Sequence, residues 1–470
     1  MLKVYNTLTG QKEVFEPNTG KKVKLFVCGV TPYDFSHIGH ARTYLAFDMI
    51  AKYLKQKGYR VFYLQNVTDI DDKIILRAQY QNIAPKALAK RFEKEYLKDM
   101  KSLKIDSVTK YAKATHHIKE IIAQIEKLFK KGLAYQTRDG VYYNIKNFKD
   151  YGKLSQRTVE GAEDAVSRID EDKEKKNKGD FCLWKFSKPG EPSWDFKTGK
   201  YLGVAGPAFA KASAGKPGWH IEDTAIAEKF LGQQYDIHGG AKDLIFPHHE
   251  AEIAQMEAIS GKAPMAKYWL HTGFLTVQGG KMAKSENNFI TIQDFLKQHS
   301  ARILRFLVLK NHYRSPIDYT ENTCLQVEKE LTRIDEFVAK LQSQIFTNSI
   351  REYSRINIRN YSRSFEAAME DDFNTPKAVA VIFELMRRRD TLDAKSALDF
   401  LKQIDKFFGF IFWPRTKETI PEALLNLVKQ RQVHREQGDW QKSDELRKQI
   451  QARGWQIEDT AAGPKLKRSN

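Results

Sequence analysis

Hydrophobic and polar positions follow two different periods in the first part of the chain. The stretch "KVKLFVCGV" at residues 22–30 is short, rich in β-branched residues and glycine-terminated, which predicts a buried strand. Apolar residues then recur on one side of a helix that ends near Gly58, and "RVFYLQNV" predicts a second strand. A strand, a helix and a strand in succession form a βαβ unit, so we expect an α/β fold with a doubly wound parallel sheet of the Rossmann type.

Several residues with chemically useful side chains fall where these predicted strands end. Cys28 closes the first strand, His37 and His40 follow it, and Thr68 follows the second. Ligands of doubly wound sheets bind at the carboxyl ends of the strands. We therefore expect these four residues to lie near one another at a binding site.

Changes of pattern along the chain predict five regions. Residues 1–138 and 219–300 form the two halves of the sheet domain, and the charged, irregular residues 139–218 form an insertion between them. Long helical periods dominate residues 301–413. A basic segment, residues 414–470, follows a proline-containing linker and is expected to be a small separate domain.

Composition indicates a cytoplasmic protein that binds a polyanion. No apolar run among the 470 residues approaches the roughly 18–20 needed to cross a bilayer, and the start of the chain lacks a signal-peptide profile. The three cysteines are odd in number and far apart, which argues against a disulfide framework and favours a cytoplasmic protein. The formal net charge of +19 indicates a polyanionic partner, nucleic acid first, although charge that only keeps the protein soluble is the alternative.

The stretch "FPHHEAEIAQ" crowds two histidines and two glutamates into the five residues from His248 to Glu252. Imidazoles and carboxylates are metal ligands, so a metal site is one interpretation. A polar start of a helix, exposed to solvent, is the other. The ten residues alone do not decide between them.

Two short motifs point to phosphate chemistry. In "HIGH", His37 and His40 can donate hydrogen bonds to phosphate oxygens, and Gly39 leaves space for a base or a sugar. In "KMAKS", Lys281 and Lys284 stand on a loop that can close on a pyrophosphate leaving group. Each motif alone also fits an ordinary solvated loop. Their order, one after the first strand and one after the last, predicts nucleotidyl transfer in which ATP loses pyrophosphate.

At this point the chain resembles the cysteinyl-tRNA synthetases, which are class I aminoacyl-tRNA synthetases. The resemblance covers nearly the whole chain and rests on these stretches, in the family's order: "FVCGVTPYDFSHIGHAR", "NVTDIDDKI", "DFCLWK", "PGWHIE", "DIHGGAKDLIFPHHEAEIAQ", "KMAKS", "HYRSPIDY", "MEDDFNTP" and "SDELRKQI". It implies one zinc ion that binds the substrate thiol. The matching ligand positions are Cys28, Asp223, His248 and Glu252, and His249 and Glu250 are implied to be their neighbours.

The sequence departs from the family's usual pattern in three places. Asp223 stands where many members have cysteine, Ala283 stands in "KMAKS" where serine is usual, and the small-residue loop 203–214 is unusually long. Aspartate is also a zinc ligand, monoanionic like a thiolate. The alternative is that Asp223 only lies nearby and zinc has three protein ligands.

The resemblance also implies substrates and further residues. Thr68, Trp219 and His238 are implied to surround the amino-acid pocket, although each also fits ordinary packing. The implied reaction takes ATP with Mg²⁺ and L-cysteine to cysteinyl-adenylate and then to tRNA(Cys). His37 and His40 are expected to stabilise the reacting phosphorus, and Lys281 and Lys284 the pyrophosphate.

The tRNA is expected to lie along residues 301–413, and its anticodon to meet residues 414–470. Trp440 and Trp455 in that tail can either stack on bases or pack. We expect a monomer with no membrane partner. Two other interpretations remain: a cysteine ligase of thiol biosynthesis, and a catalytically impaired paralogue that only binds zinc or RNA.

Overall fold

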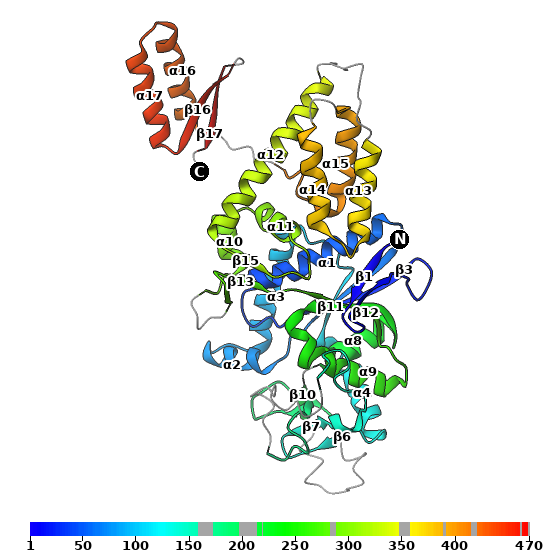
Figure 1. The fold of residues 1–470 in the computed structure, drawn as a ribbon. Helices are drawn as coiled ribbons and strands as arrows, with labels where there is room; N and C mark the ends of the chain where they lie inside the picture. Colours follow the sequence, from blue (N-terminus) through cyan, green and yellow to red (C-terminus); the bar gives the residue numbers. More distant parts are fainter. Residues whose placement is uncertain are drawn as a thin grey trace. The chain divides into compact units, whose positions relative to one another are not determined.

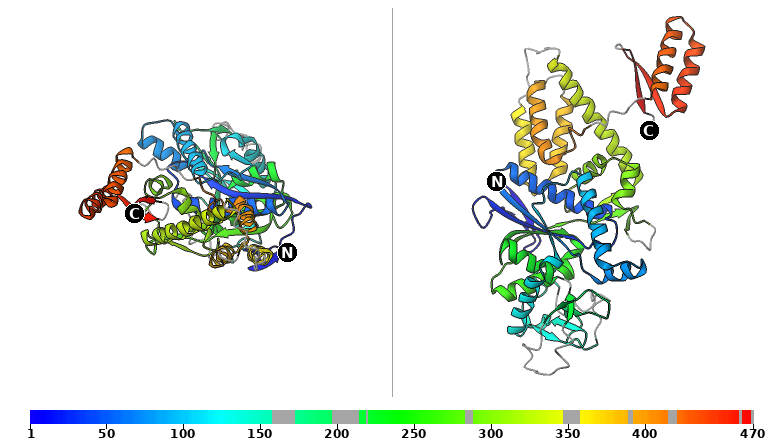
Figure 2. Two further views of the ribbon diagram at one scale, coloured as in Figure 1. Left: turned by 90° about the horizontal axis from the view of Figure 1, so that it is seen from above. Right: turned by 180° about the vertical axis from the view of Figure 1, so that it is seen from behind.

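The structure is a computed structural model (Figures 1 and 2) that describes residues 1–157, 173–196, 214–218, 220–282, 288–346, 358–388, 392–414, 421–460 and 463–468. The chain divides into two compact units, Met1–Phe412 and Trp413–Asn470. No helix in these described ranges combines the length and apolar character that a membrane crossing requires.

A five-stranded parallel sheet forms the centre of the first unit. Its strands are β3 (Lys22–Val30), β4 (Arg60–Val67), β5 (Lys110–Lys113), β11 (Tyr235–Ala241) and β12 (Ala266–Thr272). They lie in the order β12-β11-β3-β4-β5, and every neighbouring pair is parallel. The chain enters this sheet at β3, adds β4 and β5 on one side, and then adds β11 and β12 on the other side of β3. The β3–β11 border is therefore the switch point at which such sheets bind ligands, and the predicted fold class is confirmed.

Helices lie on both faces of this sheet, as Figure 1 shows: α1 (Ile38–Gln56) on one side, and α8 (Ile221–Leu231) and α9 (Glu250–Ser260) on the other. The inner residues of β3, from Leu25 to Val27, are completely buried, as expected for a strand covered on both faces. The other elements of this half are β1 (Lys3–Asn6), β2 (Gln11–Val14), α2 (Asp72–Tyr80), α3 (Pro85–Ser102) and α4 (Ile118–Lys130).

The sequence pattern of residues 139–218 is irregular, but their described part contains regular strands, and the sheet they form begins earlier, at Ala134. An antiparallel sheet in the order β6-β7-β8-β10-β9 is formed by β6 (Ala134–Gln136), β7 (Gly140–Tyr143), β8 (Phe181–Phe186), β9 (Trp194–Asp195) and β10 (Ala214–Pro217). These strands are between two and six residues long, so a period of two is hard to see in the sequence. Most of the predicted small-residue loop, residues 203–213, lies outside the described residues.

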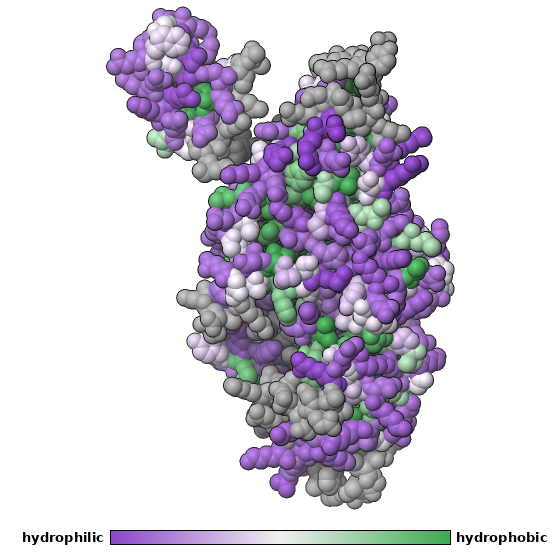
Figure 3. Space-filling model, viewed as in Figure 1, coloured by the Kyte–Doolittle hydropathy of each residue, from purple (hydrophilic) through white to green (hydrophobic). Residues whose placement is uncertain are grey.

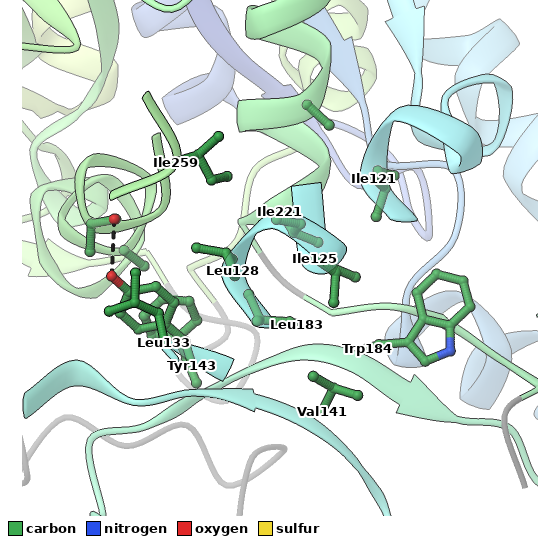
Figure 4. Close-up of a cluster of buried hydrophobic side chains, with 14 of the residues drawn as sticks. Ile121, Ile125, Leu128, Leu133, Val141, Tyr143, Leu183, Trp184, Ile221 and Ile259 are labelled. Carbon is green, nitrogen blue, oxygen red and sulfur yellow. Dashed lines mark hydrogen bonds between the residues drawn. The ribbon is translucent and has the colours of Figure 1, made fainter. Parts of the chain in front are cut away.

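The insertion is attached to the sheet domain by a shared hydrophobic core (Figure 4). Ile125 and Leu128 of α4 pack in one cluster with Val141, Leu183 and Trp184 of the insertion sheet. The hydroxyl of Tyr143, also in that sheet, donates to the carbonyl oxygen of Ala254 in α9 at 3.0 Å. The insertion is thus held against the helix that carries part of the candidate site.

The rest of the first unit is largely helical. A small sheet contains β13 (Leu275–Val277), β14 (Gly280–Lys281) and β15 (Ile317–Tyr319), the last of which lies between the second and third helices of this part. The helices are α10 (Ile292–Gln298), α11 (Ala301–Leu309), α12 (Glu321–Phe346), α13 (Ile358–Glu370), α14 (Thr375–Arg387) and α15 (Ala394–Phe408). Arg305 of α11 is completely buried and donates to the Asp48 carboxylate of α1 at 2.8 Å and to the carbonyl oxygen of Phe407 at 3.2 Å. One guanidinium therefore joins α1, α11 and the end of α15.

The second unit contains α16 (Glu422–Glu436), α17 (Trp440–Ala452) and a hairpin of β16 (Trp455–Thr460) and β17 (Gly463–Arg468). Trp455 is buried with Leu424 and Ile450, so its role is packing. Trp440 is 61% exposed and lies under the Arg435 guanidinium, 5.4 Å from the ring centre. The described surface of this unit is mostly hydrophilic in the view of Figure 3.

Candidate active site

The sulfur of Cys28 lies at the switch point of the sheet, near the carboxyl end of β3. Cys28 is buried, and its Sγ is 3.2 Å from Nε2 of His249, 3.5 Å from Nε2 of His238 and 3.7 Å from Oε1 of Glu252. His238 belongs to the neighbouring strand β11, and His249 and Glu252 belong to the segment that follows β11. Parallel pairing of β3 with β11 thus brings together residues more than two hundred positions apart.

The "FPHHEAEIAQ" stretch forms a π-helical turn over Ile245–His249 that continues into α9. The two residues spaced i, i+4 meet on one face: Nε2 of His248 is 2.9 Å from Oε1 of Glu252. Oδ2 of Asp223, in the first turn of α8, is also 2.9 Å from that nitrogen. One imidazole nitrogen therefore faces two carboxylate oxygens.

Burial and neighbouring charges shift the pKa values of three groups in this cluster. Burial and the nearby Glu252 carboxylate raise the pKa of the Cys28 thiol well above its usual value. Burial raises the pKa of Glu252 to about 7 even though His248 opposes that shift. Burial lowers the pKa of His248, but Glu252 and Asp223 more than compensate and raise it overall. The carboxylates of Glu252 and Asp223 therefore stabilise a positive charge in this cluster.

The residues present fit a bound zinc ion. Cys28, His248, His249 and Glu252 each have one donor atom within 4.8 Å of the others, and Asp223 adjoins this group through His248. The second carboxylate oxygen, Oδ1 of Asp223, is buried and has no hydrogen-bond partner among the described residues. A thiol, imidazoles and carboxylates are the donors that zinc takes in proteins. A buried carboxylate oxygen with no partner is costly unless a cation meets it.

Two neighbours of the predicted ligands have distinct roles. Nδ1 of His249 is 2.8 Å from Nε2 of His271, whose Nδ1 is 2.8 Å from the hydroxyl of Thr7, so this chain of contacts orients the His249 ring. Glu250 instead turns away and accepts the backbone N–H groups of Gly152 and Ser155 at 2.9 and 2.8 Å. Sequence reasoning missed the contribution of His271, which carries no local motif.

The "HIGH" residues form the start of α1. Nδ1 of His37 accepts the backbone N–H of Gly39 at 3.1 Å, and Nδ1 of His40 accepts the backbone N–H of His37 at 3.3 Å, a reciprocal cap. Burial and the nearby His37 lower the pKa of His40 well below its usual value. Since Nδ1 of a neutral ring accepts here, the ring proton is on Nε2. Both imidazoles are thereby set to donate from Nε2.

The space around Gly39 leaves no room for a side chain. A Cβ at this position would stand 2.9 Å from the His37 ring and 3.3 Å from the methyl carbon of Met282. Met282 belongs to "KMAKS", and after that loop the backbone N–H of Ile38 donates to the carbonyl of Ile290 at 3.1 Å. Met282 and Ile290, on either side of residues 283–287, are therefore beside the start of α1, while Ala283, Lys284 and Ser285 lie outside the described residues.

Two of the remaining predicted residues, Thr68 and His238, lie around the same edge of the sheet. The hydroxyl of Thr68 is 3.4 Å from Oε1 of the buried Glu222. His238 stacks on Trp269 with ring centres 4.3 Å apart, and its Nδ1 is 2.7 Å from the Tyr235 hydroxyl. The predicted pocket residue Trp219 lies outside the described residues. Lys281 ends β14, and nothing further is described of its side chain.

Comparison with known proteins agrees with this geometry. The fold is that of class I synthetases: a methionyl-tRNA synthetase from Mycobacterium tuberculosis aligns with a TM-score of 0.58 at 14% identity, over 83% of this chain and 88% of that one. A putative arginyl-tRNA synthetase from Campylobacter jejuni gives 0.56 at 12%, over 84% and 93%. The sequence model of the tRNA synthetases class I (C) catalytic domain matches residues 14–329, and that of the DALR domain matches residues 364–412.

Curated relatives specify the family further. A cysteine–tRNA ligase from Thermococcus onnurineus is 42% identical over 99% of both chains. One from Methanococcus maripaludis is 44% identical over 98% of this chain and 97% of its own, and one from Carboxydothermus hydrogenoformans is 40% identical over 99% and 100%. The chain belongs to the cysteine–tRNA ligase family.

Proposed function

We propose that this protein activates L-cysteine with ATP, releasing pyrophosphate, and transfers the cysteinyl group to the 3′ end of tRNA(Cys). The observation that carries the proposal is the convergence of Cys28, His248 and Glu252 at the switch point, on the same sheet edge as the start of α1. It is supported by similarity to cysteine–tRNA ligases along the full chain.

Zinc is the metal that we assign to this cluster, held by Cys28, Asp223, His248 and Glu252. His249 is a further donor within reach of the same point. When bound, zinc would supply a centre that prefers the sulfur of cysteine to the hydroxyl of serine. Shape alone discriminates such similar substrates only about 10–200-fold, so the donor set explains selectivity without a separate editing step. Thr68, Trp219 and His238 complete the amino-acid pocket in this proposal.

The start of α1 handles the phosphate chemistry. The substrate carboxylate attacks the α-phosphorus of ATP, which enters with Mg²⁺, and forms the acyl-phosphate bond as pyrophosphate leaves. His37 and His40 donate from Nε2 to the oxygens that gain charge in this step. Lys281 and Lys284 neutralise the departing pyrophosphate. A terminal ribose hydroxyl of tRNA then attacks the carbonyl carbon and releases AMP.

The remaining chain binds the body of the tRNA. Residues 301–413 contact its stem and residues 414–470 its anticodon. In the second unit the exposed Trp440 offers a ring face for a base, beside Arg435, which pairs with Asp459. The protein acts in the cytoplasm as a monomer.

ATP–pyrophosphate exchange on protein of known zinc content, with cysteine and with serine and without tRNA, tests this proposal. We expect exchange with cysteine alone and about one zinc per chain. No exchange despite bound zinc would favour an impaired paralogue, and no zinc would refute the assignment of the cluster. Transfer of the activated cysteine to an amino sugar instead of tRNA would identify a ligase of thiol biosynthesis.

A further inference from the structure

A cavity of about 630 Å³ opens beside the candidate active site, and none of the residues assigned above lines it. It lies between α3, the loop after β4, the turn after β5 and the insertion strand β9. Asp69 and Ile70 in its wall directly follow Thr68. The cavity therefore opens at the carboxyl ends of β4 and β5, on the same sheet edge as Cys28.

The floor of the cavity is apolar and partly aromatic. Trp194 of β9 is half-buried and packs against Ile70 and Ala114. Ala89 of α3 lines the same floor, and Leu97 of α3 remains 38% exposed. An apolar lining that includes a half-buried indole suits the face of a nucleobase.

The rim of the cavity is basic. Lys86, Lys90 and Lys94 recur every four residues along α3, are exposed, and have no ion-pair partner among the described residues. The acidic groups of the lining are already engaged. Glu93 pairs with Lys113, and Asp69 accepts both the backbone N–H and the hydroxyl of Thr115. A row of uncompensated ammonium groups at this spacing is complementary to successive phosphates of a strand.

We propose that this cavity binds an unpaired nucleotide of the tRNA acceptor end that precedes the terminal adenosine. Its base lies on Trp194, and the phosphates beside it meet Lys90 and Lys94. The location favours this part of the RNA, because the end that receives cysteine must reach this edge of the sheet in the proposed reaction. The inference rests on the proposed function.

Two variants and a matched control test the proposal on the full-length protein. Trp194→Ala removes the floor, and the double variant Lys90→Ala/Lys94→Ala removes two rim charges without touching a buried group. Lys101→Ala is the control, because Lys101 is exposed on the same helix and does not line the cavity. Each is assayed for tRNA affinity, for the KM for tRNA in aminoacylation, and for tRNA-free ATP–pyrophosphate exchange with cysteine.

We expect each cavity variant to raise the KM for tRNA roughly tenfold while exchange and the control stay at the wild-type level. The double lysine variant should also lower the slope of log K against log salt by about 1.4, since each phosphate contact to a single strand contributes about 0.7.

The decisive comparison uses tRNA(Cys) with and without its unpaired 3′ nucleotides. The wild type should bind the intact RNA roughly tenfold more tightly, and both variants should lose this preference. A preference that survives in the lysine variant would overturn the proposal, as would an equal effect of Lys101→Ala. Absence of exchange in the wild type would instead contradict the proposed function.

Discussion

His37 and His40 hold the same helix end with the same kind of atom: Nδ1 of each ring accepts a backbone N–H group, and the two rings stack with centres 3.7 Å apart. The cap therefore leaves the opposite side of each imidazole for the proposed catalytic role. The cap places the proton on Nε2, and Nε2 is the atom that can reach a phosphate oxygen.

Substitution of His37 separates these two uses. His37→Asn keeps a side-chain acceptor at the N-cap and should unfold within about 0.5 kcal/mol of the wild type, whereas His37→Ala should lose about 1 kcal/mol. Both lack the imidazole donor and should reduce exchange about 10²–10³-fold. Denaturant unfolding and exchange rates measure the two effects. Wild-type exchange by His37→Asn would contradict the assigned role.

Asp223 should be needed for tight zinc binding. Asp223→Ala removes a carboxylate that faces Nε2 of His248 at 2.9 Å, and zinc affinity measured by competition with a chelator should fall at least 10-fold. Asp223→Cys is the matched control and should retain zinc, because a thiolate carries the same charge. Stoichiometric, equally tight zinc in Asp223→Ala would show that three other protein ligands suffice.

Asp99 should make the protein less stable as the pH rises. Burial and the neighbouring Glu95 raise the pKa of this α3 carboxyl from 3.8 to about 7. Between these values the folded state holds a proton that the unfolded state has lost, so its stability contribution is present at pH 4 and lost as the pH rises through 7. Asp99→Asn mimics the protonated form and should gain about 1–2 kcal/mol at pH 8 and nearly nothing at pH 4.

Urea unfolding at the two pH values measures this difference. Glu95→Gln serves as the comparison, because it removes only the neighbouring charge and should give a smaller gain at pH 8. Equal gains for Asp99→Asn at both pH values would show that the carboxyl titrates normally.

Arg305 should contribute strongly to stability through Asp48. The two side chains are completely buried and 2.8 Å apart, so Arg305→Met leaves a buried carboxylate with less compensation and should cost about 3–5 kcal/mol. Asp48→Asn in the Arg305→Met background removes the carboxylate charge that then has only Lys52 as a cationic partner, and should restore part of that loss. Additive losses in the double variant, measured by denaturant unfolding, would contradict coupling between the two residues.

The sequence predicted those parts of the fold that have a long period or a local motif. The β3–α1–β4 unit and the i, i+4 pair His248 and Glu252 are visible because neighbouring residues in the chain determine them. The insertion strands are as short as the two residues of β9, which is too short for a pattern. The arrangement of Cys28 beside His249, and of His249 beside His271, depends on the pairing of distant strands, which no local pattern encodes.

The contacts of Glu250 connect the candidate metal cluster with a distant segment of the chain. It lies between His249 and Glu252 on the same turn, yet its carboxylate holds the backbone of residues 152–155 in the insertion. Movement of this turn should therefore disturb a segment in which Gly152 and Leu154 are buried and Lys153 and Ser155 are partly exposed. The rate of limited proteolysis near Gly152 should therefore report whether the cluster around Cys28 and Glu252 is intact. This measurement needs no substrate, nucleotide or RNA.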